Sequence, residues 1–219
     1  VLTPSTPQEM LDLTMLAFDL AFKYRNPVVI ASDGYLGQMT GKVSLPDSMI
    51  KPGIPAWGVW GDKDHRRNLI SSIYLAESDL EAWNVHLNEK YEAMKVEQRA
   101  DLYMCDDAEV VLVACTTPSR MAKGAVGALR AKGIKAGLFR PITVWPFPIE
   151  KFRTVLPNAK RIVVVEASNG QLEDELKLAL ANARICDYPE IENVRHFGGV
   201  LPQLEEIVTK VVAGQEVTV

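Results

Sequence analysis

Several polar and charged residues stand directly after apolar runs of the sequence, which is the position where open α/β sheets place ligand-binding groups. These candidates are Asp33, Thr116–Thr117, Arg140–Pro141, Glu166 with Ser168–Asn169–Gly170, and Gly198–Gly199. A carboxylate such as Asp33 can bind a ligand or a metal, and Glu166 could act as a general base. However, aspartate before glycine more often caps a turn, and a glutamate that ends a strand more often pairs with a neighbouring helix or turn.

Motifs for common chemistries are missing around these candidates. No G-x-G-x-x-G follows the run 110–114, and no G-x-S-x-G or C-x-x-C is present. Gly61-Asp62-Lys63 lacks the spacing of a phosphate loop, and His86 has no second ligand at i+4. The cluster His65–Arg67 is most simply a solvated basic patch, although a phosphate or an acidic partner is an alternative. We therefore predict no catalytic residue and no metal ligand on this chain.

A strand–helix–strand unit must position the central candidates. Residues 110–114 are continuously apolar, Thr117 offers a hydroxyl cap and Pro118 suits a first helical turn. Gly133 is a helix stop before a second strand at 134–139, so the two strands should be parallel. A strand at 161–166, a helix from 172, a strand at 191–197 and a helix at 202–212 follow. This alternation predicts an α/β fold, an open and mostly parallel sheet with helices on both faces.

The amino-terminal part has a different pattern. A capping box at Thr6–Glu9 predicts a helix over 7–24, followed by a buried strand at 28–31. One helix and one strand cannot cover a sheet, so this part resembles the tail of a domain whose front half lies elsewhere. Residues 41–78 are irregular, and a capping box at Ser78–Glu81 predicts a long amphipathic helix to about residue 97.

Composition excludes some classes of protein. The chain has 219 residues, a formal net charge of -4 and three cysteines, Cys105, Cys115 and Cys186, in no paired spacing. Mild acidity argues against general nucleic-acid binding, no apolar run reaches the length of a membrane span, and scattered cysteines fit a reducing cytoplasm. Because the chain begins with Val1, we expect it to be a piece of something longer.

The segment R-P-I-T-V-W-P-F-P at 140–148 is predicted to be a rigid connector first and a partner contact second. Its three prolines lock the backbone and remove amide donors, so it should not be a central strand. Arg140 could pair with Glu166 across the sheet edge. Trp145 could pack in the core or anchor another subunit.

Three stretches carry a resemblance that covers essentially the whole chain: residues 4–39, 66–91 and 106–148. They are similar to the α subunit of 2-oxoacid:ferredoxin oxidoreductases, and most similar to its 2-oxoisovalerate (branched-chain) type. The resemblance implies three regions: 1–50, the carboxyl-terminal end of a thiamine pyrimidine-type domain; 51–105, an irregular linker and long helix; and 106–219, a transketolase C-terminal-like domain.

The resemblance also implies cofactors and partners, which belong to the complete complex. Such enzymes use thiamine diphosphate, magnesium, coenzyme A and iron–sulfur clusters to convert 2-oxoacids to acyl-CoA. The motif G-D-G followed by asparagine is absent here, and the family keeps it on a separate β subunit. We expect this chain to hold no cofactor alone and to act with that β subunit, a ferredoxin-like subunit and ferredoxin, with a homodimer as one arrangement. Its candidate subunit contacts are Gln38, Met39, Arg140 and Trp145. The alternative is a free-standing α/β binding or regulatory module without catalysis.

Overall fold

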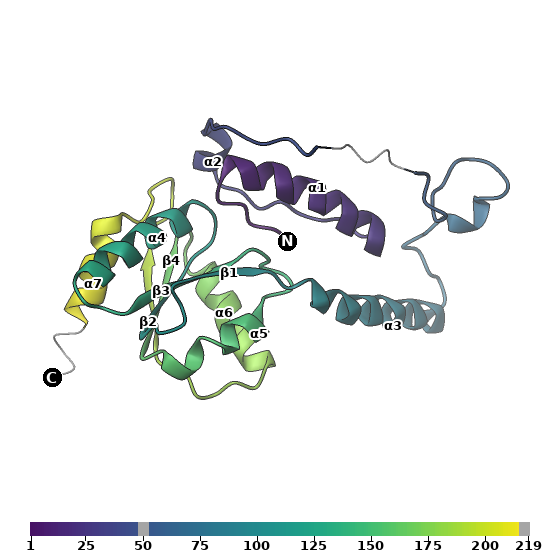
Figure 1. Ribbon diagram of the computed structural model, residues 1–219. Coiled ribbons are helices and arrows are strands. Elements are labelled where there is room, and N and C mark those ends of the chain that lie inside the picture. The colour runs from purple at the N-terminus through teal and green to yellow at the C-terminus, as the bar shows by residue number, and fades with distance from the viewer. Residues whose placement is uncertain (48–52, 215–219) are drawn as a thin grey trace.

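A five-stranded sheet in the order β1-β3-β2-β4-β5 forms the centre of the protein (Figure 1). The computed structural model describes residues 1–47 and 53–214. The strands are β1 (Ala100–Tyr103), β2 (Val110–Val113), β3 (Ala136–Pro141), β4 (Arg161–Glu166) and β5 (Ile191–Arg195). Strands β2 to β5 are parallel, and β1 pairs antiparallel with β3 at one edge. The predicted open, mostly parallel sheet is confirmed.

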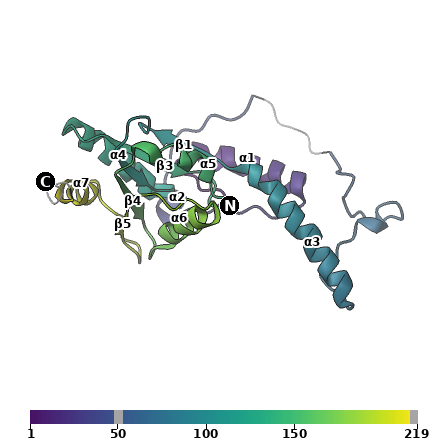
Figure 2. The same ribbon diagram turned by 90° about the horizontal axis from the view of Figure 1, so that it is seen from below.

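Helices cover both faces of this sheet, as the sequence predicts (Figure 1, Figure 2). Helices α4 (Thr116–Ala131) and α7 (Leu204–Ala213) pack on the face that carries Leu112 and Leu138. Helices α5 (Ile149–Arg153) and α6 (Gln171–Asn182) pack on the face that carries Val111 and Phe139. Successive residues of β2 enter opposite layers, which is why this strand is apolar at every position.

The predicted strand–helix–strand unit is present as β2–α4–β3. Val113 lies opposite Phe139 in a parallel register. Gly133 follows α4 with φ of 81°, a left-handed conformation that glycine adopts without strain. The second strand begins at Ala136, two residues later than predicted, and runs through Arg140 and Pro141. The prediction that this proline segment stays outside a central strand is therefore wrong for its first two residues, because Pro141 needs no amide donor at a strand end.

Strand β1 was not predicted from the sequence. It lies inside the expected linker region, so the sheet begins before residue 106. The strand is short and half exposed, and Asp101 interrupts any apolar run. Residues 100–103 form a strand because they pair with β3, where Tyr103 lies opposite Leu138. The predicted boundary at residues 50–51 and Pro52 lie outside the described residues.

The amino-terminal part consists of α1 (Pro7–Tyr24), α2 (Gly34–Gln38) and the extended segments around them. The predicted bounds of α1 are confirmed, and Thr6 accepts a hydrogen bond from the Glu9 backbone amide. The predicted buried strand at 28–31 is wrong. Among the described residues, the segment makes a single parallel bridge, from Ile30 to Leu2, and pairs with no longer strand; Val29 is 53% exposed.

Helix α3 (Glu77–Met94) extends away from the sheet in both views (Figure 1, Figure 2). It begins one residue before the expected cap, after Ala76, which makes no side-chain cap bond. Only Met94 of this helix is buried. Three short 3-10 turns complete the chain: η1 (Arg66–Asn68), η2 (Lys95–Glu97) and η3 (Leu156–Asn158). None of the helices within residues 1–47 and 53–214 is long and apolar enough to cross a membrane.

Candidate functional site at the carboxyl edge of the sheet

Asp33 joins the amino-terminal part to the sheet edge by capping two helices at once. Its Oδ1 accepts hydrogen bonds from the Leu36 amide at 2.9 Å and from the Thr117 hydroxyl at 2.8 Å. Its Oδ2 accepts from the Thr117 amide at 2.9 Å. Burial opposes the charge of Asp33, but these donors outweigh it and lower the pKa of the carboxyl. The turn-capping interpretation of Asp33 is confirmed, and the same carboxylate also caps the first turn of α4.

Thr117 therefore does not cap α4, contrary to prediction. The helix begins at Thr116, two residues before the predicted start at Pro118, and the Thr117 hydroxyl donates to Asp33 instead of accepting from the helix. Thr116, the first helical residue, has φ of 52°, a left-handed conformation that is uncommon outside glycine. Asp33 thus replaces a local cap with one supplied from 84 residues away.

Arg140 pairs with Glu9, not with Glu166 as predicted. Its two terminal nitrogens donate to the Glu9 carboxylate at 2.7 and 2.9 Å, and one of them also reaches the Ser5 hydroxyl at 3.2 Å. The Arg140 side chain is 8% exposed and that of Glu9 is 28% exposed. Asp101 on β1 lies 3.6 Å from the guanidinium. This bidentate pair fastens the first turn of α1 to the end of β3.

Glu166 has its own set of donors, which explains why Arg140 does not reach it. The carboxylate accepts hydrogen bonds from the hydroxyl of Ser168, the backbone amide of Leu172 and the side-chain amide of Asn193. Two of these donors lie at the start of α6 and on β5. The buried carboxylate therefore ties the turn after β4 to α6 and β5, which is the pairing with a neighbouring helix that the sequence favoured.

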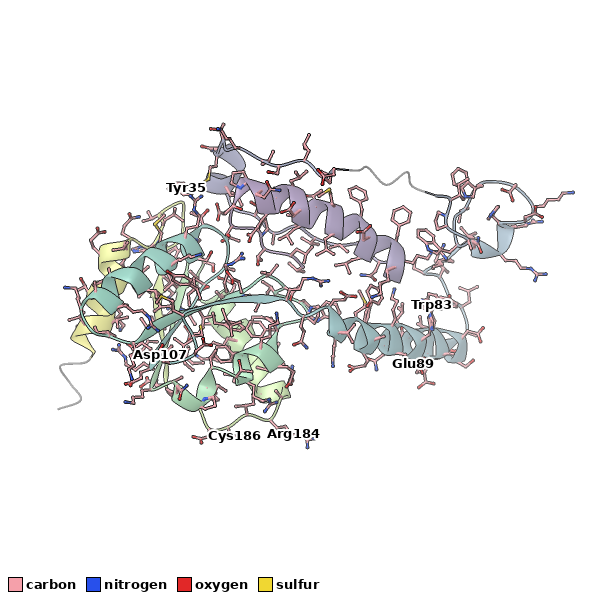
Figure 3. All side chains as sticks on the ribbon, in the orientation of Figure 1. Tyr35, Trp83, Glu89, Asp107, Arg184 and Cys186 are labelled. Atoms are coloured by element: carbon pink, nitrogen blue, oxygen red, sulfur yellow. The ribbon has the colours of Figure 1, made fainter. Side chains whose placement is uncertain are left out.

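A cleft opens at the same edge, between α2 and the loops that follow β4 and β5. Its lining comprises Asp33, Gly34, Tyr35, Gln38, Ala167, Gly199, Val200 and Leu201. The Tyr35 hydroxyl donates to the Gly199 carbonyl at 2.8 Å across the cleft. Figure 3 shows Tyr35 at the α2 end of the molecule, above the sheet edge. The two predicted strand-end positions Asp33 and Gly199 are thus brought to one cleft.

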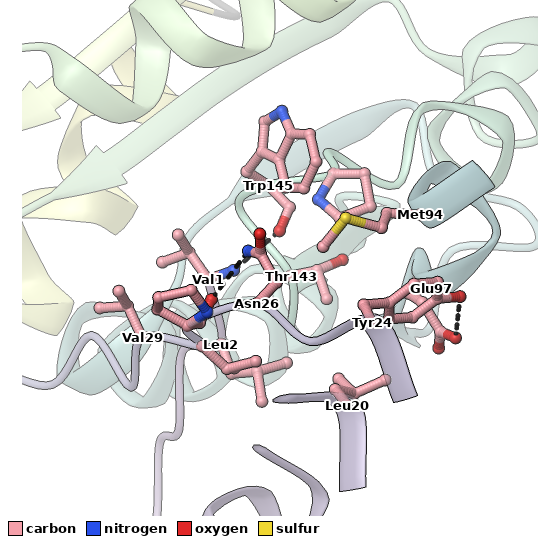
Figure 4. Close-up of a pocket in the computed structure, with 13 residues that line it drawn as sticks. Val1, Leu2, Leu20, Tyr24, Asn26, Val29, Met94, Glu97, Thr143 and Trp145 are labelled. Atoms are coloured by element: carbon pink, nitrogen blue, oxygen red, sulfur yellow. Dashed lines mark hydrogen bonds between the residues drawn. The ribbon is translucent and has the colours of Figure 1, made fainter. Parts of the chain in front are cut away.

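The segment 140–148 closes a second, apolar pocket beside the carboxyl end of α1 (Figure 4). Its lining includes Leu20, Tyr24, Met94, Thr143 and Trp145. The Trp145 ring is 41% exposed and meets the Tyr91 ring of α3 edge-on at 6.1 Å, whereas Phe147 is buried against Phe139. The segment 140–148 thus places Phe147 in the core and leaves the Trp145 ring partly at the surface.

The four candidate subunit contacts fall in different environments. Gln38 is exposed on α2, and Met39 lies beside it with its sulfur 2.7 Å from an Arg120 nitrogen. Trp145 is partly exposed, and Arg140 is buried in its pair with Glu9. Gln38, Met39 and Trp145 keep surface that another chain could cover, while the charge of Arg140 is already matched within this chain.

The polar groups of this edge are hydrogen-bonded to one another and to backbone amides. Removal from solvent and the charge of Glu166 raise the pKa of the Cys115 thiol to about 12, so it stays protonated near neutral pH. Burial likewise raises the pKa of Cys105 to about 11. In the described part of the chain, no group of three histidine, cysteine, aspartate or glutamate side chains could hold a metal ion. The hydrogen bonds of Asp33 and Glu9 join the amino-terminal part to α4 and β3.

Sequence reasoning missed Glu9 and Ser5 as functional residues of this edge. Glu9 was interpreted as the last residue of a capping box, yet its carboxylate accepts from the Ser5 amide at 2.8 Å and does not bond the Thr6 amide. A buried arginine at a strand end was the available signal, because such a charge needs a carboxylate partner.

Two family models match consecutive parts of the chain. One, described as pyruvate flavodoxin/ferredoxin oxidoreductase, thiamine diP-bdg, matches residues 1–104. The other, described as pyruvate:ferredoxin oxidoreductase core domain II, matches residues 108–207. The junction between them lies in the turn between β1 and β2.

Proteins with similar sequences and a similar solved structure agree with these matches. The ketoisovalerate oxidoreductase subunit VorB of Methanothermobacter marburgensis is 43% identical, over 98% of this chain and 60% of its own length. The 2-oxoglutarate synthase subunit KorA of Methanocaldococcus jannaschii is 31% identical, over 94% of this chain and 61% of its own length. The 2-oxoglutarate:ferredoxin oxidoreductase of Magnetococcus marinus superimposes with a TM-score of 0.71 at 16% identity, over 97% of this chain and 41% of that chain, which shows a shared fold. The chain spans about 60% of the length of the curated relatives it matches.

Proposed function

We propose, because this chain belongs to the 2-oxoacid:ferredoxin oxidoreductase family, that it forms part of the α subunit of an enzyme that oxidatively decarboxylates a 2-oxoacid to an acyl-CoA. The observation that carries the proposal is the 43% identity to a ketoisovalerate oxidoreductase subunit over 98% of the chain. A branched-chain 2-oxoacid is the proposed substrate class, since identity to the 2-oxoglutarate synthase subunits is lower, at 31% or less. The proposed compartment is the cytoplasm, where scattered free cysteines stay reduced.

Thiamine diphosphate is the cofactor that the family description names for residues 1–104. For the metal–diphosphate end, no group of three histidine, cysteine, aspartate or glutamate side chains among the described residues could hold a metal ion. The carboxylates described at the sheet edge, Glu9, Asp33 and Glu166, already accept hydrogen bonds from Arg140, from helix amides and from Asn193. We therefore assign the diphosphate and magnesium to the β subunit of the complex.

Iron–sulfur clusters are assigned to other chains by the same reasoning. Cys105 is buried after β1, Cys115 precedes α4 and Cys186 is exposed after α6. Cluster binding needs grouped cysteine thiolates, and no three metal-ligand side chains gather among the residues described. The proposed partners are a thiamine-binding β subunit and a ferredoxin-like subunit, with ferredoxin and coenzyme A as substrates of the complex.

In this proposal the chain contributes architecture and not reactive groups. Asp33 and Glu9 hold the thiamine-family part against the sheet at two points, and Asp33 also lines the cleft between α2 and the loop at Gly199. Rigid placement of one part relative to another is what a site shared between chains requires.

The test is reconstitution of the complete complex. The complete gene is co-expressed with the genes for the other subunits, and 2-oxoacid-dependent, coenzyme A-dependent reduction of ferredoxin is measured. We expect 2-oxoisovalerate to be a better substrate than pyruvate or 2-oxoglutarate. A complex that assembles but oxidises none of these 2-oxoacids would refute the proposed function.

A second measurement concerns this chain by itself. Calorimetry with thiamine diphosphate and magnesium is expected to show no saturable binding, and metal analysis to show no iron. Stoichiometric binding of either would contradict the assignment of the cofactors to other chains.

A further inference from the structure

The projecting arm of the molecule, residues 53–96, carries a larger number of exposed large apolar side chains than the sheet and its helices. Eleven large apolar side chains that are exposed fall between residues 54 and 96, compared with five between residues 106 and 213. Leu75 is 94% exposed, Ile73 is 74% exposed and Leu69 is 72% exposed. Concentrated apolar exposure of this kind marks an interaction surface.

Helix α3 shapes this surface into a shallow groove. Leu80 and Val85 form its apolar floor and are 40% and 54% exposed. The segment before the helix folds back so that the Tyr74 ring stacks on the Trp83 ring at 5.7 Å. Figure 3 shows Trp83 and Glu89 on this helix, away from the sheet. The apolar surface is therefore ordered by local contacts and still open to solvent.

The root of the arm is fixed to the rest of the chain. Glu97 accepts hydrogen bonds from the Lys23 ammonium at 2.6 Å, the Tyr24 hydroxyl at 2.7 Å and the Arg99 guanidinium at 2.9 Å. Lys90 donates to the Asn26 side chain at 3.1 Å. A partner bound to the arm would thus be held in a defined position relative to α1.

Charge identifies the kind of partner. Helix α3 carries five acidic residues, Glu77, Asp79, Glu81, Glu89 and Glu92, against one lysine, Lys90. Two copies of the helix would bring like charges together, and nucleic acids or anionic lipid headgroups would be repelled. Lysine and arginine side chains around an apolar centre would be complementary.

We propose that helix α3 of the arm is the docking surface for another polypeptide subunit of the oxidoreductase, which covers Leu80 and Val85 with apolar side chains and meets the acidic rim of α3 with basic ones. This inference rests on the proposed function, which supplies the other subunits. The arm would then position that subunit relative to α1 and Trp145.

The test compares two substitutions at equally exposed apolar positions. Val85→Glu lies in the groove, and Leu178→Glu lies on α6 outside the arm; both parent side chains are 54% exposed. Each is made in the complete gene and co-expressed with the other subunits, one of which carries the affinity tag. We expect Val85→Glu to reduce recovery of the chain with the tagged subunit by about tenfold or more, and Leu178→Glu to leave recovery unchanged.

Charge reversal supplies the second arm of the experiment. Glu81→Lys with Glu89→Lys keeps the apolar floor and should weaken recovery most at low salt, because the rim charges then repel the basic partner. Melting temperatures of the purified variants are measured alongside recovery. A fall in recovery at an unchanged melting temperature is a loss of docking, whereas a lowered melting temperature would show that the rest of the same polypeptide covers this surface and would overturn the inference.

Several outcomes would overturn the inference. If the parent is recovered and Val85→Glu and the double charge reversal are recovered equally well, the arm is not the interface, although the proposed function survives. If the parent forms a dimer by light scattering that Val85→Glu abolishes, the occupant is a second copy. If the parent is never recovered with any subunit, the proposed function fails and this inference fails with it.

Discussion

Removal of the Glu9 carboxylate tests how the amino-terminal part is held to the sheet. In the parent the Arg140 side chain is 8% exposed, and the variant Glu9→Ala removes its two shortest hydrogen bonds, of 2.7 and 2.9 Å. Breaking a buried ion pair from one side typically costs about 3–5 kcal/mol, because the remaining charge is left without a partner. Asp101, 3.6 Å away and 49% exposed, and the hydroxyl of Ser5 compensate in part. We therefore expect a loss of about 3 kcal/mol in the free energy of unfolding.

Urea unfolding followed by far-ultraviolet circular dichroism measures this loss, and hydrogen exchange of the α1 amides shows where it acts. The matched control is Glu150→Gln, which removes an exposed pair with Arg153 and should change stability by less than about 0.5 kcal/mol. The double variant Glu9→Ala with Arg140→Met should regain part of the loss, since no buried charge remains. If Glu9→Ala is as stable as the control, the pair does not hold α1 to the sheet and the reasoning is refuted.

The pH dependence of this loss has a definite sign. Burial raises the pKa of Glu9, but the hydrogen bonds from Arg140 and Ser5 outweigh it, so the pKa lies below its ordinary value of 4.5. A depressed folded pKa stabilises the fold fully above the unfolded pKa, and this contribution is lost as pH falls through the folded pKa. The difference between parent and Glu9→Ala should be constant above about pH 5 and shrink below 4.5.

Three further substitutions test the other contacts. Asp33→Ala removes the acceptor shared by the first turns of α2 and α4, so urea unfolding should show a loss of about 1–2 kcal/mol in the free energy of unfolding at neutral pH. This loss should diminish in acid. An unchanged stability at neutral pH would contradict the cap on Thr117. Trp145→Ala should cost about 1.5 kcal/mol through its edge contact with Tyr91, because the ring is 41% exposed, and a loss of about 3 kcal/mol or more would show a core ring. Glu97→Gln should speed hydrogen exchange in the last turn of α1; the parent carboxyl has a pKa of about 2, so its contribution is present above 4.5 and is lost as pH falls towards 2. Equal exchange rates in parent and variant at neutral pH would mean that this carboxyl does not fix the root of the arm.

The sequence by itself determined the elements whose signals are local. The helix at 7–24 is bounded by a threonine cap and by the break at Arg25-Asn26-Pro27, and β2, β4 and the helices after them follow from apolar runs and periodicity. The order of alternating strands and helices then fixed a parallel sheet covered on both faces. Asp33 was interpreted as a turn cap from the glycine that follows it, and its bond to the Leu36 amide confirms this.

Only the tertiary structure decided the contacts that join distant segments. Strand β1 exists because β3 offers it a free edge, and the segment 28–31 makes one bridge because no neighbouring strand completes its ladder. Arg140 needs a carboxylate partner, and local sequence cannot distinguish Glu9, 131 residues away, from Glu166. In the structure Glu166 instead accepts hydrogen bonds from Ser168, from the Leu172 amide of α6 and from Asn193. Caps and periodicity depend on neighbours along the chain, whereas the partner of a buried charge is the group that packing brings within about 3 Å.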